Sequence, residues 1–206
     1  GKEAFSFMRA VNTGHPGSIS TLHADTPALA MEQLILMIMQ AGLGITRDQI
    51  RSYVENVVNG IIQLNRGVTL QRAGKSREAL AQFEDGLPRA LRVLGEKHPQ
   101  YQLGLMMSGE ALLDVGRTNA AIAQLRQALA LRKAHLPPDS PETPATAWGL
   151  VKGLRLAGRM DEADEVQRRE IDPLLAADPA TLTVALVDRR QRIERQIREG
   201  GPGSRR

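Results

Sequence analysis

Apolar and polar positions along residues 60–178 repeat with a step of 42 residues. Within each of three copies, apolar residues recur at three- and four-residue intervals, which places them on one face of a helix. Phe83 and Leu125 keep the step, whereas Gln167 breaks it in the third copy. The pattern therefore predicts three consecutive units, each a pair of helices. The residues that define the repeat are Leu70, Gly74, Ala79, Leu112, Gly116, Ala121, Leu154, Gly158 and Ala163.

The glycine of each copy predicts the turn between the two helices of a unit. A glycine directly after a helix adopts the left-handed conformation that ends the helix without a steric penalty. Ser76, Thr118 and Asp161 follow near the start of the next helix, where short polar side chains cap free N–H groups. The small alanine further on allows the two helices to approach closely. Because one such hairpin cannot cover its own apolar face, the three are predicted to stack into one core.

This pattern resembles the tetratricopeptide repeat, and residues 94–99, Leu-Gly-Glu-Lys-His-Pro, are similar to the long-loop version found in kinesin light chain. The resemblance implies an α-solenoid without catalytic chemistry. It also implies a concave surface, made mostly by the first helix of each unit, that binds a protein or peptide partner. Tyr101 and Trp148 lie on such first helices, where they either pack in the core or anchor a partner in the groove. His98 and His135 fall in predicted surface loops.

Residues 179–206 predict a capping helix with a basic outer face. Asp178 is the candidate N-cap, and Pro179 is the candidate first helical residue. This segment holds the whole excess behind the net charge of +4. We interpret that excess as a solvated face followed by a disordered tail, and predict no specific nucleic-acid site. The apolar side would hold Leu182, Leu186, Ile193 and Ile197, and the outer side Arg189, Arg190, Arg192, Arg195 and Arg198.

The first 59 residues follow a different pattern. Residues 5–12 predict a short helix and residues 18–23 predict a strand. A helix over 27–41 is apolar on nearly all sides, which is typical of a helix buried over most of its surface. Residues 46–49, Thr-Arg-Asp-Gln, form a capping box that opens a further helix to about Val58.

Residues 14–24, Gly-His-Pro-Gly-Ser-Ile-Ser-Thr-Leu-His-Ala, closely resemble the histidine box of the traffic ATPases of type IV secretion and conjugation. The similarity begins near Glu3 and extends to about Leu64. It implies a truncated RecA-like segment in which nucleotide-sensing positions fall on His15, Gly17, Ser18, Thr21 and His23. A vestigial loop and strand without a ligand is the alternative interpretation of the same residues.

The chemistry that a nucleotide needs is missing from the sequence as given. No Gly-x-x-x-x-Gly-Lys-Ser/Thr phosphate loop occurs, and the family's catalytic acidic residue lies upstream of Gly1. We therefore predict no catalytic residue and no cofactor for this chain. ATP and Mg²⁺ are expected only if a missing N-terminal part is supplied. His15 and His23 match no common ligand spacing, so no metal site is predicted.

A RecA-like segment without its neighbouring strands leaves the 27–41 helix uncovered. Packing against the first repeat is the first expectation, and self-association through this helix is the second. Residues 60–65 belong to both patterns: the ATPase resemblance makes them a strand, and the 42-residue register makes them the opening helix of the first repeat. Because an isolated strand has no ladder partner, we expect a helix.

The predicted fold is mainly α: a truncated RecA-like segment (1–59), a three-unit tetratricopeptide-like α-solenoid (60–178), and a capping helix with a basic tail (179–206). The absence of cysteine favours the cytoplasm, and no apolar run reaches the ~20 residues of a membrane span. A secretion partner would place the chain peripherally at the inner membrane of a bacterium.

Three hypotheses about function follow. The chain is a scaffold that binds a protein partner, including type IV secretion components. Alternatively, it is a fragment of a secretion ATPase subunit that moves protein or DNA, with its nucleotide-binding half outside this sequence; the start at Gly1 fits a fragment. The third possibility is a non-functional product of gene fusion.

Overall fold

A computed structural model describes residues 27–40 and 44–199, with side chains for all of these except 27–31 and 56–61. The described part is helical, without a strand. No helix within it is long and apolar enough to cross a membrane. Its elements are α2 (Pro27–Met39), α3 (Arg47–Arg72), α4 (Ser76–Leu94), α5 (Pro99–Asp114), α6 (Thr118–His135), α7 (Glu142–Leu156), α8 (Met160–Glu170), α9 (Asp172–Ala176), the 3₁₀ turn η1 (Pro179–Thr181) and α10 (Val184–Arg198).

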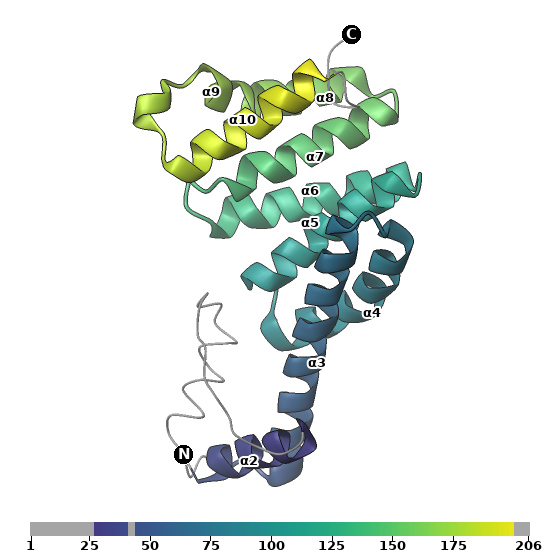
Figure 1. The fold of residues 1–206 in the computed structure, drawn as a ribbon, viewed down its shortest axis with the longest axis vertical. Helices are drawn as coiled ribbons and strands as arrows, with labels where there is room; N and C mark the ends of the chain where they lie inside the picture. Colours follow the sequence, from purple (N-terminus) through teal and green to yellow (C-terminus); the bar gives the residue numbers. More distant parts are fainter. Residues whose placement is uncertain (1–26, 41–43, 200–206) are drawn as a thin grey trace.

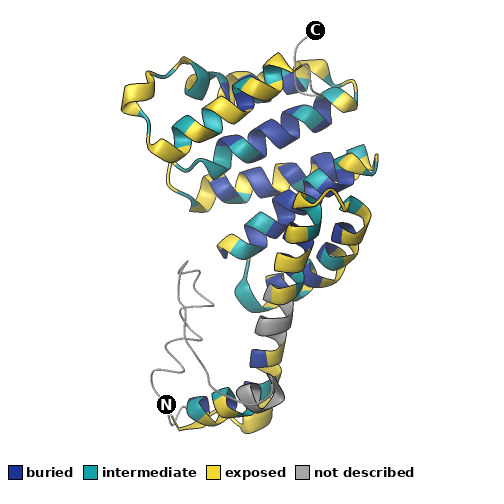
Figure 2. Ribbon diagram, in the orientation of Figure 1, coloured by how far each residue is buried: buried dark blue, intermediate teal, exposed yellow. Residues whose placement is uncertain are grey.

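Helices α3 to α8 form the predicted stack of three hairpins, α3–α4, α5–α6 and α7–α8 (Figure 1). The first helix of each hairpin contacts its own second helix and the first helix of the next hairpin. Buried residues concentrate along α5 and α7, in the middle of the stack (Figure 2). The mainly helical solenoid is therefore confirmed.

Each hairpin turn has the same hydrogen-bond pattern. Gly74, Gly116 and Gly158 adopt φ values of 73°, 81° and 73°. After each glycine, the next residue donates its backbone N–H to the carbonyl of the repeat-defining leucine, at 2.9 Å for Leu70, 2.8 Å for Leu112 and 2.9 Å for Leu154. This is the paired bonding that closes a helix on a glycine.

The predicted capping by Ser76, Thr118 and Asp161 is wrong. The N-cap residues are Lys75, Arg117 and Arg159, and none of their side chains caps the helix. The glycine turn places those residues at the N-cap position and moves the short polar ones into the first helical turn. There the hydroxyl of Ser76 donates to Asp114 at 2.7 Å, which ties the first hairpin to the second.

Close helix contact within a hairpin depends on a small residue facing a large one. A Cβ atom on Gly67 would lie 2.6 Å from the ring of Phe83, and one on Gly109 would lie 2.7 Å from Leu125. Both distances are shorter than real Cβ contacts allow, so any larger residue would force the facing side chain to shift. The repeat-defining alanines Ala79, Ala121 and Ala163 have no exposed surface, as their predicted role requires.

The third copy breaks this pairing for a structural reason. Val151 and Gln167 stand where the first two copies have glycine and a large apolar residue. The Gln167 amide accepts a hydrogen bond from Arg155 at 2.7 Å and donates one to Asp172 at 3.1 Å. It thus joins α7, α8 and α9 through polar bonds at a mostly buried position.

The capping box at Thr46 is confirmed, with reciprocal bonds between Thr46 and Gln49. The helix that it opens does not end near Val58, as predicted, but continues to Arg72 as one helix, α3. Residues 60–65 are therefore helical, as expected. The boundary that we placed at residue 59 falls inside α3.

Helix α2 has the predicted extent but not the predicted burial. Ile35 and Ile38 are buried, whereas Leu36 is 50% and Met39 42% exposed. The helix contacts α3 (Figure 1), and Glu32 forms ion pairs with Arg47 and Arg51 near the start of α3. One side of α2 is thus covered by the extension of the first repeat's opening helix, and self-association through its other side stays a prediction.

The C-terminal helix starts later than predicted. Asp178 caps only η1, and α10 begins at Val184 with Thr183 as its N-cap. The second arginine of α10, Arg190, is not on an outer face, because it bonds to Glu194 and to the carbonyl of Ala177.

His98 is buried, contrary to the surface position predicted for it. Its Nδ1 atom accepts the backbone N–H of Gln100 at 3.1 Å and so caps α5. The Gln102 side chain donates to the carbonyl of Glu96 at 3.2 Å. The loop between the first two hairpins is therefore fixed by residues at the start of α5.

Candidate partner-binding groove

A groove of about 490 Å³ lies where α5, α7 and α10 face one another. Each helix contributes residues at the three- and four-residue spacing of a single face. Leu103, Met106, Met107 and Glu110 come from α5; Glu142, Ala145, Trp148 and Lys152 come from α7; Arg189, Arg192, Ile193 and Gln196 come from α10. Apolar and charged side chains both line the groove.

Helix α10 forms the third wall because it lies beside α7 (Figure 1). Ile193 is 2% exposed and belongs to the continuous core of the stack. Trp148 donates its indole N–H to the side chain of Gln196. The capping helix thus takes the place that the first helix of a further hairpin would occupy.

The two aromatic residues singled out in the sequence have different positions. Both Tyr101 and Trp148 are 4% exposed and pack in the core. Burial raises the pKa of Tyr101, Glu96 raises it further, and a hydrogen bond with Gln127 opposes the shift. Trp148 also lines the groove, whereas Tyr101 is not among the lining residues. The proposal of a partner anchor therefore rests on Trp148.

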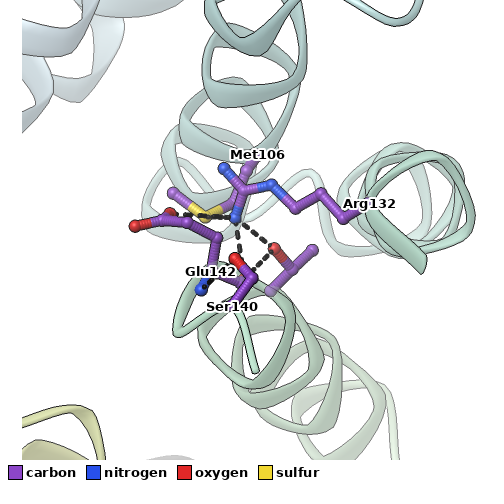
Figure 3. Close-up of polar contacts among 5 residues, drawn as sticks. Met106, Arg132, Ser140 and Glu142 are labelled. Carbon is purple, nitrogen blue, oxygen red and sulfur yellow. Dashed lines mark hydrogen bonds and ion pairs between the residues drawn. The ribbon is translucent and has the colours of Figure 1, made fainter. Parts of the chain in front are cut away.

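Arg132 comes from α6 and lines the groove, and its guanidinium group lies between Met106 and Glu142 (Figure 3). Its Nη1 atom donates to the Thr146 hydroxyl at 2.6 Å and to the carbonyl of Glu142 at 2.8 Å, and lies 3.2 Å from the Met106 sulfur. The carboxylate of Glu142 lies 3.3 Å from Nη1, and Arg132 is only 2% exposed. Burial lowers the pKa of Arg132, and the charge of Glu142 opposes that shift.

Our interpretation of the sequence did not find Arg132. The equivalent positions of the other copies hold Ala90 and Leu174, so the arginine is not part of the repeat. One signal in the sequence could have identified Arg132: it is a charged residue at a position where the other copies have apolar residues.

A second cavity, of about 320 Å³, lies between α6 and α8. Ion pairs cross it from Arg126 to Glu162 and from Lys133 to Glu170. Hydrogen bonds from Arg159 lower the pKa of Glu162, and Arg126 adds to this shift. Because these charges pair with each other, the cavity is a weaker candidate for a ligand than the groove.

The nucleotide-sensing positions predicted from the resemblance, His15, Gly17, Ser18, Thr21 and His23, lie outside the described residues. The short helix over 5–12 and the strand over 18–23 lie outside them too. Within the described ranges, no group of three His, Cys, Asp or Glu side chains is arranged to hold a metal ion.

Comparison with known proteins gives two kinds of similarity. Residues 60–134 match the family model of the tetratricopeptide repeat. This range covers the first two hairpins and stops before α7, so the third hairpin lies outside the family match.

The chain is also similar to proteins of type IV secretion systems. It is 43% identical to VirB11 of Bartonella henselae over 65 residues, 31% of this chain and 18% of that protein. It is 36% identical to PtlH of Bordetella pertussis over 93 residues, 43% of this chain and 26% of that protein. It is 30% identical to VirB11 of Brucella suis over 102 residues, 48% of this chain and 27% of that protein. The matched part of the chain thus spans between 18% and 27% of the length of these relatives.

Proposed function

We propose that this chain is a protein-binding module whose groove receives a segment of a partner protein. The observation that carries the proposal is the groove itself, which is lined by apolar and charged side chains and formed by the first helices of two tetratricopeptide-like hairpins and by α10. Binding sites of this kind combine an apolar contact surface with a few polar groups that fix orientation.

The surroundings of the groove favour a preformed site. Trp148 and Ile193 are packed in the core, and Arg132 is held by three hydrogen-bond partners. A wall fixed in this way loses little conformational entropy when a ligand binds, so more of the contact energy appears as affinity. Partner side chains would enter between α5 and α7, next to Met106 and Ala145.

The proposal is tested by selecting peptides from a random display library against the full chain. Trp148 is the only tryptophan in the sequence and lines the groove, so its emission reports binding there. Ala145→Arg places a long side chain in the groove and should abolish the emission change. Ala130→Arg makes the same substitution at an exposed position beside the second cavity and should leave binding intact.

If the Ala145→Arg variant binds the selected peptides with unchanged affinity and the emission of Trp148 does not change, the ligand binds elsewhere. That result would refute the groove proposal.

We further propose that the partner is a component of a type IV secretion system, encountered in the cytoplasm or at the inner membrane. The support is the similarity to VirB11 and PtlH. Co-purification of the full chain with secretion proteins from the same cell tests this assignment, with Ala145→Arg as the control. Equal recovery by the two chains would count against groove-mediated assembly.

A second candidate function is favoured by the 43% identity to VirB11. In this reading, the chain belongs to a larger secretion ATPase, and the repeats are an adaptor. A phosphate loop in the coding sequence upstream of Gly1 would support it. Binding of ATP by the 206-residue chain at micromolar concentration would favour it over the scaffold proposal.

A further inference from the structure

Two arginines that line the groove have buried donor atoms without a partner. The Nε atoms of Arg132 and Arg189 are both inaccessible to solvent and form no hydrogen bond. All the hydrogen bonds of Arg132 run through Nη1. Buried donors without an acceptor are uncommon in folded proteins, and they mark positions where a missing group would complete the structure.

The two guanidinium groups also repel each other. The charge of Arg189 lowers the pKa of Arg132 beyond the effect of burial. Within the described part of the chain, Arg189 has no ion pair and no hydrogen bond of its own. Two like charges in one partly enclosed groove are stabilised by a negative charge placed between them.

The carboxylates of the groove do not supply that charge. Glu110 lies 3.8 Å from Lys152, and Glu142 lies 3.3 Å from Arg132 on its Nη1 side. Arg192, on the same helix as Arg189, pairs with Asp188 at 2.9 Å. The groove therefore keeps an excess of positive charge centred on Arg189.

We propose that the groove binds an acidic peptide segment, with a Glu or Asp carboxylate of the partner seated between Arg132 and Arg189. This inference rests on the proposed function and adds the chemistry of the ligand. Apolar side chains that flank the carboxylate would contact Met106 and Trp148, which line the same groove. A guanidinium group matches a carboxylate in shape and donates two hydrogen bonds to it.

A peptide fits this groove better than a nucleic acid. A polyphosphate backbone would pass the carboxylates of Glu110 and Glu142, and like charges at short range oppose binding. A peptide can place one carboxylate at the arginine pair and neutral residues beside the two glutamates.

The test uses the full chain and two pools of synthetic peptides of equal length. In both pools every second position is random; the positions between are all Glu in one pool and all Gln in the other. Emission of Trp148 reports binding of each. The Glu pool should bind about tenfold more tightly, because hydrogen bonds between charged groups are the stronger ones, and the difference should shrink as salt is added.

Arg189→Gln is the informative variant, because Arg189 makes no hydrogen bond to any described residue, whereas Arg132 also holds Thr146. It should remove the preference for the Glu pool, so that the two pools bind with equal affinity. Arg195→Gln removes the same charge from an exposed position of α10 outside the groove, and should keep the preference.

The outcomes separate the two proposals. Equal binding of both pools would overturn the acidic-segment proposal and leave the groove function standing, whereas no response to either pool would count against both. Loss of the preference in Arg195→Gln as large as in Arg189→Gln would show general charge attraction instead of a site. A single-stranded oligonucleotide should compete poorly with the Glu pool. If it displaces the Glu pool at concentrations below those at which the Glu pool itself binds, the ligand of the groove is a nucleic acid and the peptide proposal is wrong.

Discussion

The front of the described chain and the repeat stack are both built from helices, yet they are held together differently. Helix α2 covers the start of α3 with a small apolar contact that includes Ile35 and Ile38, and with two ion pairs from Glu32. In the stack, one continuous core runs from Leu64 to Ile193. Repetition makes this difference, because each hairpin in the stack covers the apolar face of the next.

The comparison also separates two roles of α3. The N-terminal half of α3 is the part that α2 contacts, near Arg47. The C-terminal half of α3 is the opening helix of hairpin α3–α4. A single helix therefore connects a segment with little core of its own to a segment with a large one. Damage to the stack should unfold the whole chain, and damage at the front should stay local.

The largest effect is expected from Phe83→Ala. The ring has no exposed surface and fills the space beside Gly67, so its removal leaves a cavity between α3 and α4. We expect the free energy of unfolding to fall by about 3–5 kcal/mol, measured by urea denaturation followed by circular dichroism. A loss below about 1 kcal/mol would show that the first hairpin is not packed as described.

Gly109→Ala should have the next largest effect. Its Cβ would lie 2.7 Å from Leu125, and relief of that clash requires the helices to separate. We expect a loss of about 1–3 kcal/mol in the same measurement. Gly149→Ala is the matched control, because its Cβ would lie 3.4 Å from the same leucine. Equal losses in the two variants would contradict the close approach at Gly109.

Gly116→Ala tests the hairpin turn without a steric clash. No atom lies within 4 Å of a Cβ at this position, but φ is 81°, a conformation that alanine adopts at a cost of about 1–2 kcal/mol. The free energy of unfolding should fall by that amount. An unchanged value would mean that the backbone of this turn differs from the left-handed geometry.

The smallest effect is expected at the front. Hydrogen bonding to Arg47 lowers the pKa of Glu32 from its ordinary value of 4.5, burial opposes the shift, and Arg51 adds to it. A carboxylate whose pKa is lowered by folding stabilises the folded state above that ordinary value and loses the effect as the pH falls through its folded pKa. Helical NMR shifts of α2 should therefore decrease below about pH 4.5, while those of α5 and α7 persist.

Glu32→Gln removes the carboxylate that causes this pH dependence. In this variant, the helical NMR shifts of α2 should already be smaller at neutral pH and should change little on acidification. Parallel loss of helical shifts in α2 and α7 would contradict the local character of the front.

The sequence predicted the parts of the fold that repeat. The glycines at 74, 116 and 158 and the alanines that follow them identified each hairpin, because backbone conformation and close packing leave few alternatives at those positions. The capping box at Thr46 was predictable for the same local reason. The end of that helix was not, since nothing in the residues near Val58 shows that the first repeat continues the same helix.

The candidate site was harder to predict because its parts do not repeat. Trp148 was identified as an aromatic residue on a first helix, but its bond to Gln196 depends on the start of α10 at Val184. Arg132 departs from the repeat, and its burial depends on acceptors that α7 supplies. Contacts between distant segments decide both, and no short motif encodes them.

Hydrogen exchange along the full chain, with and without a selected peptide, tests most directly the claim that the stack binds a partner through its groove. Bound peptide should slow exchange in α5, α7 and α10 and leave exchange in α2 unchanged. Slower exchange confined to α2 and the first half of α3 would contradict it.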